Sequence, residues 1–80
     1  MPAVLLMEFD IETRRFQALR EVELASVPTF GDKVVINIDG IGFIFKVYDS
    51  HYGENSMVDV NVIRISTITD YYGTRYPDIK

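Results

Sequence analysis

Apolar and polar residues alternate along the middle of the chain with a period of two, which is typical of half-buried β-strands. The segments KVVINI (33–38) and IGFIFKVY (41–48) both carry an apolar residue at every second position. Between them lies Asp39-Gly40, a pair that favours the two-residue turn of a tight hairpin because both positions adopt positive φ. Gly42 interrupts the second segment, which indicates a bulge or a close approach of another part of the chain. The pattern predicts a β-hairpin over these two segments.

A third alternating segment, MVDVNVIRI, follows the polar loop DSHYGEN. Its valines share one face, but Ile63 and Ile65 continue on the other parity. A β-bulge near Val62-Ile63 would return the apolar residues to one face. The three segments together predict a β-meander over residues 33–66. The residues assigned to the core are Phe9, Phe43, Phe45 and Val60.

The N-terminal segment AVLLMEFDIE predicts a strand with one polar face, on which Leu5, Met7, Phe9 and Ile11 form the apolar side. Residues 15–25 are ambiguous, because RRFQALREVELA is rich in helix formers and yet most of its apolar residues also fit a period of two. A strand is favoured, since the rest of the chain is β and IETRR can serve as a hairpin loop. A short helix at 15–25 is the alternative.

The C-terminal segment STITDYYGTRYPDIK begins with β-branched residues and then becomes rich in tyrosine. It predicts a short strand or 3₁₀ turn at residues 66–72. The Tyr-rich tail as a whole covers residues 67–80, and its end either packs on the domain or frays.

Eighty residues are enough for one small domain, residues 1–80. Five short strands joined by tight turns would leave long open edges in a flat sheet, and such edges promote aggregation. A strongly bent sheet of five to six strands avoids this by nearly closing on itself, as in small SH3-like or OB-like barrels. The expected fold class is therefore all-β, with a strongly bent sheet of five to six strands or an SH3-like barrel as the architecture.

The stretch VPTFGDKVVI…GFIFKVYDSHYGENSMVDVNVIRI, within residues 27–65, resembles the pattern vPxxGDxV…FxVxxVxH…VxVxVxxI. This pattern is found in small uncharacterised bacterial and phage proteins with an SH3-like β-barrel. The resemblance covers half of the chain and implies the barrel fold. Because those proteins share no activity, it implies no functional residue.

The composition mainly excludes certain kinds of chemistry and certain classes of protein. Hydrophobic residues make up 48% of the chain and charged residues 25%, as in an ordinary globular domain. The absence of cysteine excludes disulfides, thiolate nucleophiles and cysteine-based metal sites, and it is common in reducing compartments. The apolar run from Ala3 to Met7 is too short for a signal peptide or a membrane span, and no basic residue precedes it. We expect a cytoplasmic protein that does not act at a membrane.

The loop DSHYGEN holds the single histidine of the chain, so it is the first place to look for chemistry. Asp49 and His51 point the same way on an extended strand, and Glu54 is close. A non-haem iron triad requires a second histidine, and three ligands from one loop lack the support that a zinc site needs. No serine stands in a glycine-flanked nucleophile elbow. We therefore expect no catalytic residue, no metal and no cofactor, and a protein that is not an enzyme.

The remaining hypothesis is a small non-catalytic interaction module that binds a protein or peptide partner. Tyrosine and arginine are frequent interface anchors, and they concentrate in loop 49–56 and in the C-terminal segment. If the tail folds beside the loop, the two form one amphipathic patch. The residues expected to bind the partner are His51, Tyr52, Tyr71, Tyr72, Arg75 and Tyr76.

Two other functions and a homodimer remain open. The net charge of −4 argues against nucleic-acid binding, although Arg14, Arg15 and Arg20 near Phe16 keep a nucleic-acid-binding barrel as an alternative. Small size and acidity also fit a phage or mobile-element inhibitor of a host enzyme. A homodimer would form by pairing of edge strands such as residues 4–11.

Overall fold

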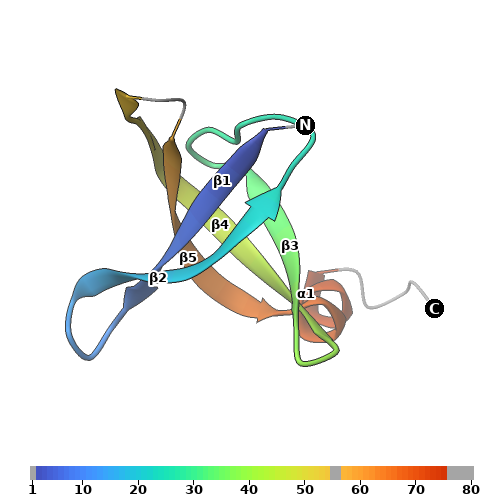
Figure 1. Ribbon diagram of the computed structural model, residues 1–80. Helices are drawn as coiled ribbons and strands as arrows, with labels where there is room; N and C mark the ends of the chain where they lie inside the picture. Colours follow the sequence, from blue (N-terminus) through green and yellow to red (C-terminus); the bar gives the residue numbers. More distant parts are fainter. Residues whose placement is uncertain (1, 55–56, 76–80) are drawn as a thin grey trace.

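The computed structural model describes residues 2–54 and 57–75, and these contain five strands and one helix (Figure 1). The elements are β1 (Ala3–Asp10), β2 (Arg15–Glu23), β3 (Lys33–Ile38), β4 (Ile41–Tyr52), β5 (Val58–Thr67) and α1 (Ile68–Arg75). The expected all-β fold with a strongly bent sheet is confirmed. The ambiguity at residues 15–25 is resolved as a strand, because β2 pairs with β1 over its whole length and is held by that ladder whatever its helix propensity.

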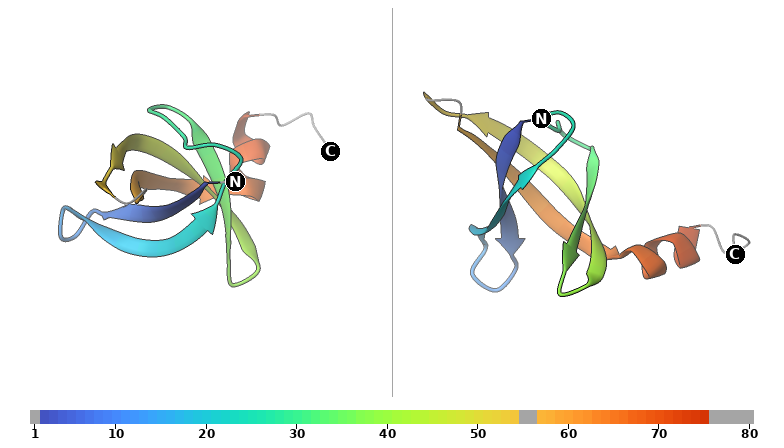
Figure 2. Two further views of the ribbon diagram at one scale, coloured as in Figure 1. Left: turned by 45° about the horizontal axis from the view of Figure 1, so that its top comes forward. Right: turned by 45° about the vertical axis from the view of Figure 1, so that its right-hand side comes forward.

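The strands form one sheet in the order β2-β1-β5-β4-β3, which curls into a half-barrel (Figures 1 and 2). Neighbouring strands are antiparallel except β1 and β5, which run parallel. The two edges of the sheet are therefore β2 and β3. The expectation that residues 4–11 form an edge is wrong, since β1 lies between β2 and β5.

The core lies on the concave side of the curled sheet. Phe45 and Val60 are buried as predicted, and Phe43 packs against them. In β1, however, the residues that enter the core are Val4 and Leu6, not the predicted set that contains Phe9. The cause is the unbroken apolar run at residues 3–7, which fits either parity. The residues exposed by less than 2% are Val4, Leu6, Phe45, Val47, Val60 and Val62.

Three β-bulges help the sheet to bend, and none lies at the predicted position. In β5 the extra residue is Ile65, because Phe45 pairs with Arg64 and Ile44 with Ser66. The predicted bulge at residues 62–63 was meant to bring the isoleucines into the core, but Ile63 and Ile65 stay on the outer surface. The extra residues of the other two bulges are Leu19 in β2 and Tyr48 in β4.

The β3–β4 turn and the glycine that follows it behave as the sequence predicts. Asp39 and Gly40 have φ values of 52° and 80°, as the two-residue hairpin turn requires. A Cβ atom at Gly42 would lie 3.3 Å from the Cδ1 atom of Ile68, so this glycine lets α1 approach β4 closely.

Residues 68–75 form a helix where the sequence predicts a strand or a 3₁₀ turn. The backbone N–H of Asp70 donates to Oγ1 of Thr67 at 3.2 Å, so Thr67 caps the N-terminus of α1. The spacing TITD is the threonine–acid pattern of a helix start, and the acidic residue of the first turn also favours the helix dipole. This local capping outweighs the β-branched composition of the segment.

The β1–β2 turn offers a direct test of its backbone geometry. Arg14 has a φ of 58°, a region that costs a residue with a side chain about 1–2 kcal/mol. Replacing Arg14 with glycine is expected to raise the free energy of unfolding by about 0.5–1 kcal/mol, because the relief of strain exceeds the entropy cost of glycine. Urea denaturation measures this.

The neighbouring arginine supplies a matched control. Arg15 lies in β2, so an Arg15→Gly change should lower the free energy of unfolding by about 0.5–1 kcal/mol. Equal effects of the two substitutions would contradict the described geometry of the turn.

Candidate functional site

Four aromatic rings form a continuous row on the outer surface of the sheet. Phe9 and Phe16 contact edge to face with centroids 5.3 Å apart, and Phe16 lies 6.4 Å from Tyr48. The row ends at Phe30, whose ring is 6.2 Å from Tyr48 and carries the ammonium group of Lys46 at 5.7 Å. We call Phe9, Phe16, Tyr48 and Phe30 the aromatic row.

The register of the strands explains why these rings face away from the core. Phe9 and Phe16 are directly paired in the β1–β2 ladder, so their side chains lie on the same face. Tyr48 is the extra residue of its bulge and follows Val47, which is fully buried. Alternation from Val47 turns the Tyr48 ring outwards, and the bulge then leaves Asp49 on the outer face as well.

Phe30 is held in place by a tightly built loop rather than by burial. The backbone N–H and the hydroxyl of Thr29 donate to the Asp32 carboxylate, and the N–H of Asp32 donates back to the Thr29 carbonyl at 3.0 Å. Gly31 has a φ of 89°, which the turn requires, and its N–H donates to the carbonyl of Val47. The hydrogen bonds of the segment VPTFGD thus hold Phe30 against Tyr48.

The exposure of the row is large for residues of this type. Phe30 is 71% exposed and Tyr48 is 53% exposed. A single exposed apolar residue is common, but a contiguous apolar surface on a small protein indicates an interaction site. The rings of the row are not among the buried residues of the core and form an apolar surface outside it.

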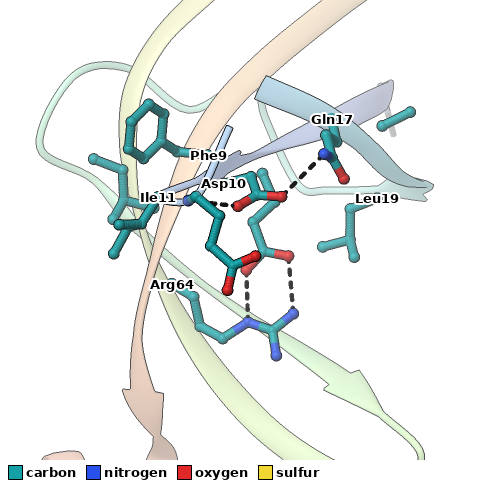
Figure 3. Close-up of a pocket in the computed structure, with 10 residues that line it drawn as sticks. Phe9, Asp10, Ile11, Gln17, Leu19 and Arg64 are labelled. Carbon is teal, nitrogen blue, oxygen red and sulfur yellow. Dashed lines mark hydrogen bonds and ion pairs between the residues drawn. The ribbon is translucent and has the colours of Figure 1, made fainter. Parts of the chain in front are cut away.

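A pocket of about 480 Å³ is lined by the β1–β2 hairpin and by β5, and Phe9 is one of its lining residues (Figure 3). Its polar groups are strongly paired. The guanidinium of Arg64 donates to both carboxylate oxygens of Glu8, at 2.7 and 2.9 Å. Asp10 accepts from the backbone N–H of Glu12 at 2.8 Å and from the side-chain amide of Gln17 at 3.0 Å.

Arg64 also closes the core at this end. Its guanidinium carbon lies 4.6 Å from the ring centroid of Phe43 and 5.3 Å from that of Phe45. A cation over aromatic faces and a bidentate carboxylate together fix the side chain. The pair with Glu8 therefore has a structural role on the concave side of the sheet, the face opposite the aromatic row.

A second polar cluster lies on the outer surface near the β4–β5 hairpin. Asp49 accepts a hydrogen bond from the side-chain amide of Asn61 at 2.6 Å, and Nε2 of His51 is 3.2 Å from its other oxygen. The hydrogen bond from His51 is the main cause that lowers the pKa of the Asp49 carboxyl below its usual value. Desolvation opposes this shift, and the hydrogen bond from Asn61 adds to it. The predicted common orientation of Asp49 and His51 is thus present. Across residues 2–54 and 57–75, no three His, Cys, Asp or Glu side chains are grouped to hold a metal ion.

This cluster predicts a specific pH dependence. A lowered pKa means that the native state favours the charged carboxylate, so its contribution to stability is present above the unfolded pKa of about 3.9 and disappears as the pH falls through the lower native value. Replacing His51 with alanine should raise the pKa of Asp49. Carboxyl NMR titration measures it, with Asn61→Ala as the comparison expected to shift it less. An unchanged Asp49 titration in His51→Ala would contradict the assignment.

The structure does not bring the two halves of the expected partner site together. Tyr52 ends β4 and is 71% exposed beside the β4–β5 hairpin, with its neighbour His51 on the other face. Tyr71 and Tyr72 lie in α1, which packs near Gly42 at the opposite end of β4 (Figure 2). Their rings contact each other edge to face at 5.5 Å.

Of the two remaining expected site residues, Arg75 is the last residue of α1 and Tyr76 lies outside the described residues. The patch that would join the loop to the tail is therefore not formed by the residues that the structure describes. The separation follows from the length of β4, twelve residues of extended chain.

Sequence reasoning missed the aromatic row because its members come from four distant segments. The alternation of residues 41–48 predicts Tyr48 on the face opposite Phe45, and the segment SVPTFGD has the composition of a loop, so two of the signals are present in the sequence. Phe9 was assigned to the core, and Phe16 was noted only for its arginine neighbours. Their convergence depends on pairing between strands, which no local pattern encodes.

Comparison with known proteins adds no family. No protein-family model matches the chain, and no match to a curated protein or to a solved structure is found. Within the described residues, no helix has the length and apolar character to cross a membrane.

Proposed function

We propose that this chain is a small non-catalytic interaction module whose aromatic row binds a protein or peptide partner. The single observation that carries the proposal is the contiguous outer surface of four rings, two of them more than half exposed, in a domain of 80 residues. Aromatic side chains are enriched at interface hot spots because they bury a large area at a small cost in conformational entropy.

The charges around the row favour a protein partner over a nucleic acid. A surface that binds a nucleic acid needs several cations beside its stacking rings to offset phosphate charge. In the described structure Lys46 is the cation that contacts the row, while Arg64 is paired with Glu8 and Arg20 donates to a main-chain carbonyl. If this chain is an inhibitor of a host enzyme, that enzyme would be the protein partner and would bind the same surface.

Affinity capture with paired variants tests the proposal. Immobilised wild-type protein, a Phe30→Ala/Tyr48→Ala variant and a Tyr52→Ala/Met57→Ala variant would be compared in lysate of the source organism. The control pair removes a similar exposed apolar area at the β4–β5 hairpin, where Tyr52 is 71% and Met57 is 63% exposed.

The proposal expects a protein that is captured by wild type and by the hairpin variant but lost with the aromatic-row variant. Loss with the hairpin variant alone would move the binding site to the loop first expected from the sequence. Equal capture by all three proteins would overturn a role for either surface.

A further inference from the structure

The two edge strands of the half-barrel leave an open seam between them. No described strand pairs with the outer edge of β2 or of β3. The two edges are linked by one side chain, because the Arg20 guanidinium on β2 donates to the carbonyl of Asn37 on β3 at 2.9 Å. The main chains of β2 and β3 are not paired with each other, so this contact across the seam is made by a long side chain.

The register shows which main-chain groups face the seam. Ile38 and Ile41 flank the two-residue turn as a hydrogen-bonded pair, so the residues that bond to β4 alternate from there along β3. The N–H and C=O groups of Lys33 and Val35 consequently point away from β4 into the seam. The contact of Arg20 with the Asn37 carbonyl, two residues further along, agrees with this alternation.

On β2, as on β3, some main-chain groups point into the seam. The N–H of Leu24 donates to the carbonyl of Pro2, which fixes the alternation in the β1–β2 ladder. By the same rule, the main-chain groups of Glu21 and Glu23 point into the seam from the other side. Both walls therefore offer strand hydrogen bonds.

The core is incompletely covered along the same line. Core side chains on the central strands β1, β4 and β5 include several that are completely buried, whereas most of those on the seam walls are half-buried, with Ile36 on β3 as the buried exception. A groove of about 340 Å³ runs beside β3 between it and the loop at residues 24–28. The half-buried residues along the seam are Leu19, Val22, Leu24, Val34 and Ile38.

We infer that the seam accepts an extended, basic segment of a partner protein as a sixth strand. Its alternate apolar side chains would cover the half-buried core residues, and its main chain would bond to Lys33 and Val35. Its outward side chains would lie beside Glu21 and Glu23, with Lys33 as the opposing cation on the other wall, in a molecule of net charge −4. Insertion displaces Arg20 from the Asn37 carbonyl. The site is separate from the aromatic row.

The test uses a capped peptide, Lys-Val-Lys-Ile-Lys-Val-Lys, and amide hydrogen exchange of the full chain. Binding should slow exchange at the amides of Lys33 and Val35. Two control peptides have the same length: one carries Glu in place of Lys, and one has every second amide N-methylated. Both should bind at least about tenfold more weakly, because one loses charge complementarity and the other loses strand hydrogen bonds.

A proline substitution isolates the main-chain contact. Val35→Pro removes an N–H that bonds to nothing in β4, and proline is tolerated at such edge positions. It should weaken the basic peptide about tenfold, whereas Val35→Thr, which keeps the N–H, should not. Arg20→Ala, which removes the competing donor, should strengthen binding and remains informative if the proline variant fails to fold.

Three results would overturn the inference: no protection at Lys33 and Val35, equal binding of the N-methylated peptide, or peptide shifts confined to the aromatic row. Concentration-dependent dimerisation that Val35→Pro abolishes would assign the seam to a second copy of this chain instead. Shifts confined to the aromatic row would support binding at Phe30 and Tyr48 while overturning the seam, and the other results leave those two residues untouched, so the proposed function stands or falls separately.

Discussion

Replacing Phe45 with alanine is expected to lower the free energy of unfolding by about 3–5 kcal/mol. The ring is completely buried and packs against residues of the central strands, so truncation leaves a cavity that the curled sheet cannot fill. Domains have a total stability of about 0.05–0.15 kcal/mol per residue, or about 4–12 kcal/mol for 80 residues. The variant should therefore unfold at low urea concentration or be unfolded without denaturant.

Tyr48 is the matched control for this substitution, because it is an aromatic residue of the same strand that faces outwards. Tyr48→Ala should change the free energy of unfolding by about 0.5 kcal/mol or less. Urea denaturation followed by circular dichroism gives both values. Similar losses for the two variants would contradict the assignment of opposite faces on β4.

Replacing Phe30 and Tyr48 with alanine is expected to have the largest effect on partner binding. Truncation of an aromatic hot spot costs about 2–4 kcal/mol, so each single variant should bind the captured partner about 30- to 1000-fold more weakly. Calorimetric titration with the purified partner measures this. The folded state should be little affected, since both side chains are more than half exposed.

Lys46→Ala separates the contribution of the rings from that of the charge. Its ammonium group lies over the Phe30 ring, and an exposed cation–π contact is worth about 0.5–1 kcal/mol. Its loss should weaken binding only about twofold to fivefold. A larger effect than that of Tyr48→Ala would show that charge, not aromatic contact, dominates the interface.

The sequence predicts the hairpin at residues 33–48 and the third strand well because their apolar pattern is unambiguous and Asp39-Gly40 is a strong turn signal. It predicts β1 as a strand but on the wrong face, since five apolar residues in succession fit both parities. Arg64 is a further example. Its inward position continues the alternation of Val60 and Val62, and its pairing with the carboxylate of Glu8 joins residues 56 positions apart in the chain.

At the candidate site, too, features set by neighbouring residues could be predicted from the sequence, whereas features set by contacts between distant segments could not. The TITD capping pattern that begins α1 was present in the sequence, so that helix could have been predicted from local chemistry. The aromatic row could not, because Phe9 meets Phe16 through strand pairing and Tyr48 meets Phe30 through a loop that folds back on β4. The tyrosines near His51 and in α1 formed the stronger local signal, and the structure places them at opposite ends of β4.

The most direct test of the central claim is chemical-shift mapping of the ¹⁵N-labelled protein as the captured partner is added. We expect the largest changes at Phe9, Phe16, Phe30, Lys46 and Tyr48. Changes confined to residues 50–57 or to α1, with the aromatic row unaffected, would contradict it.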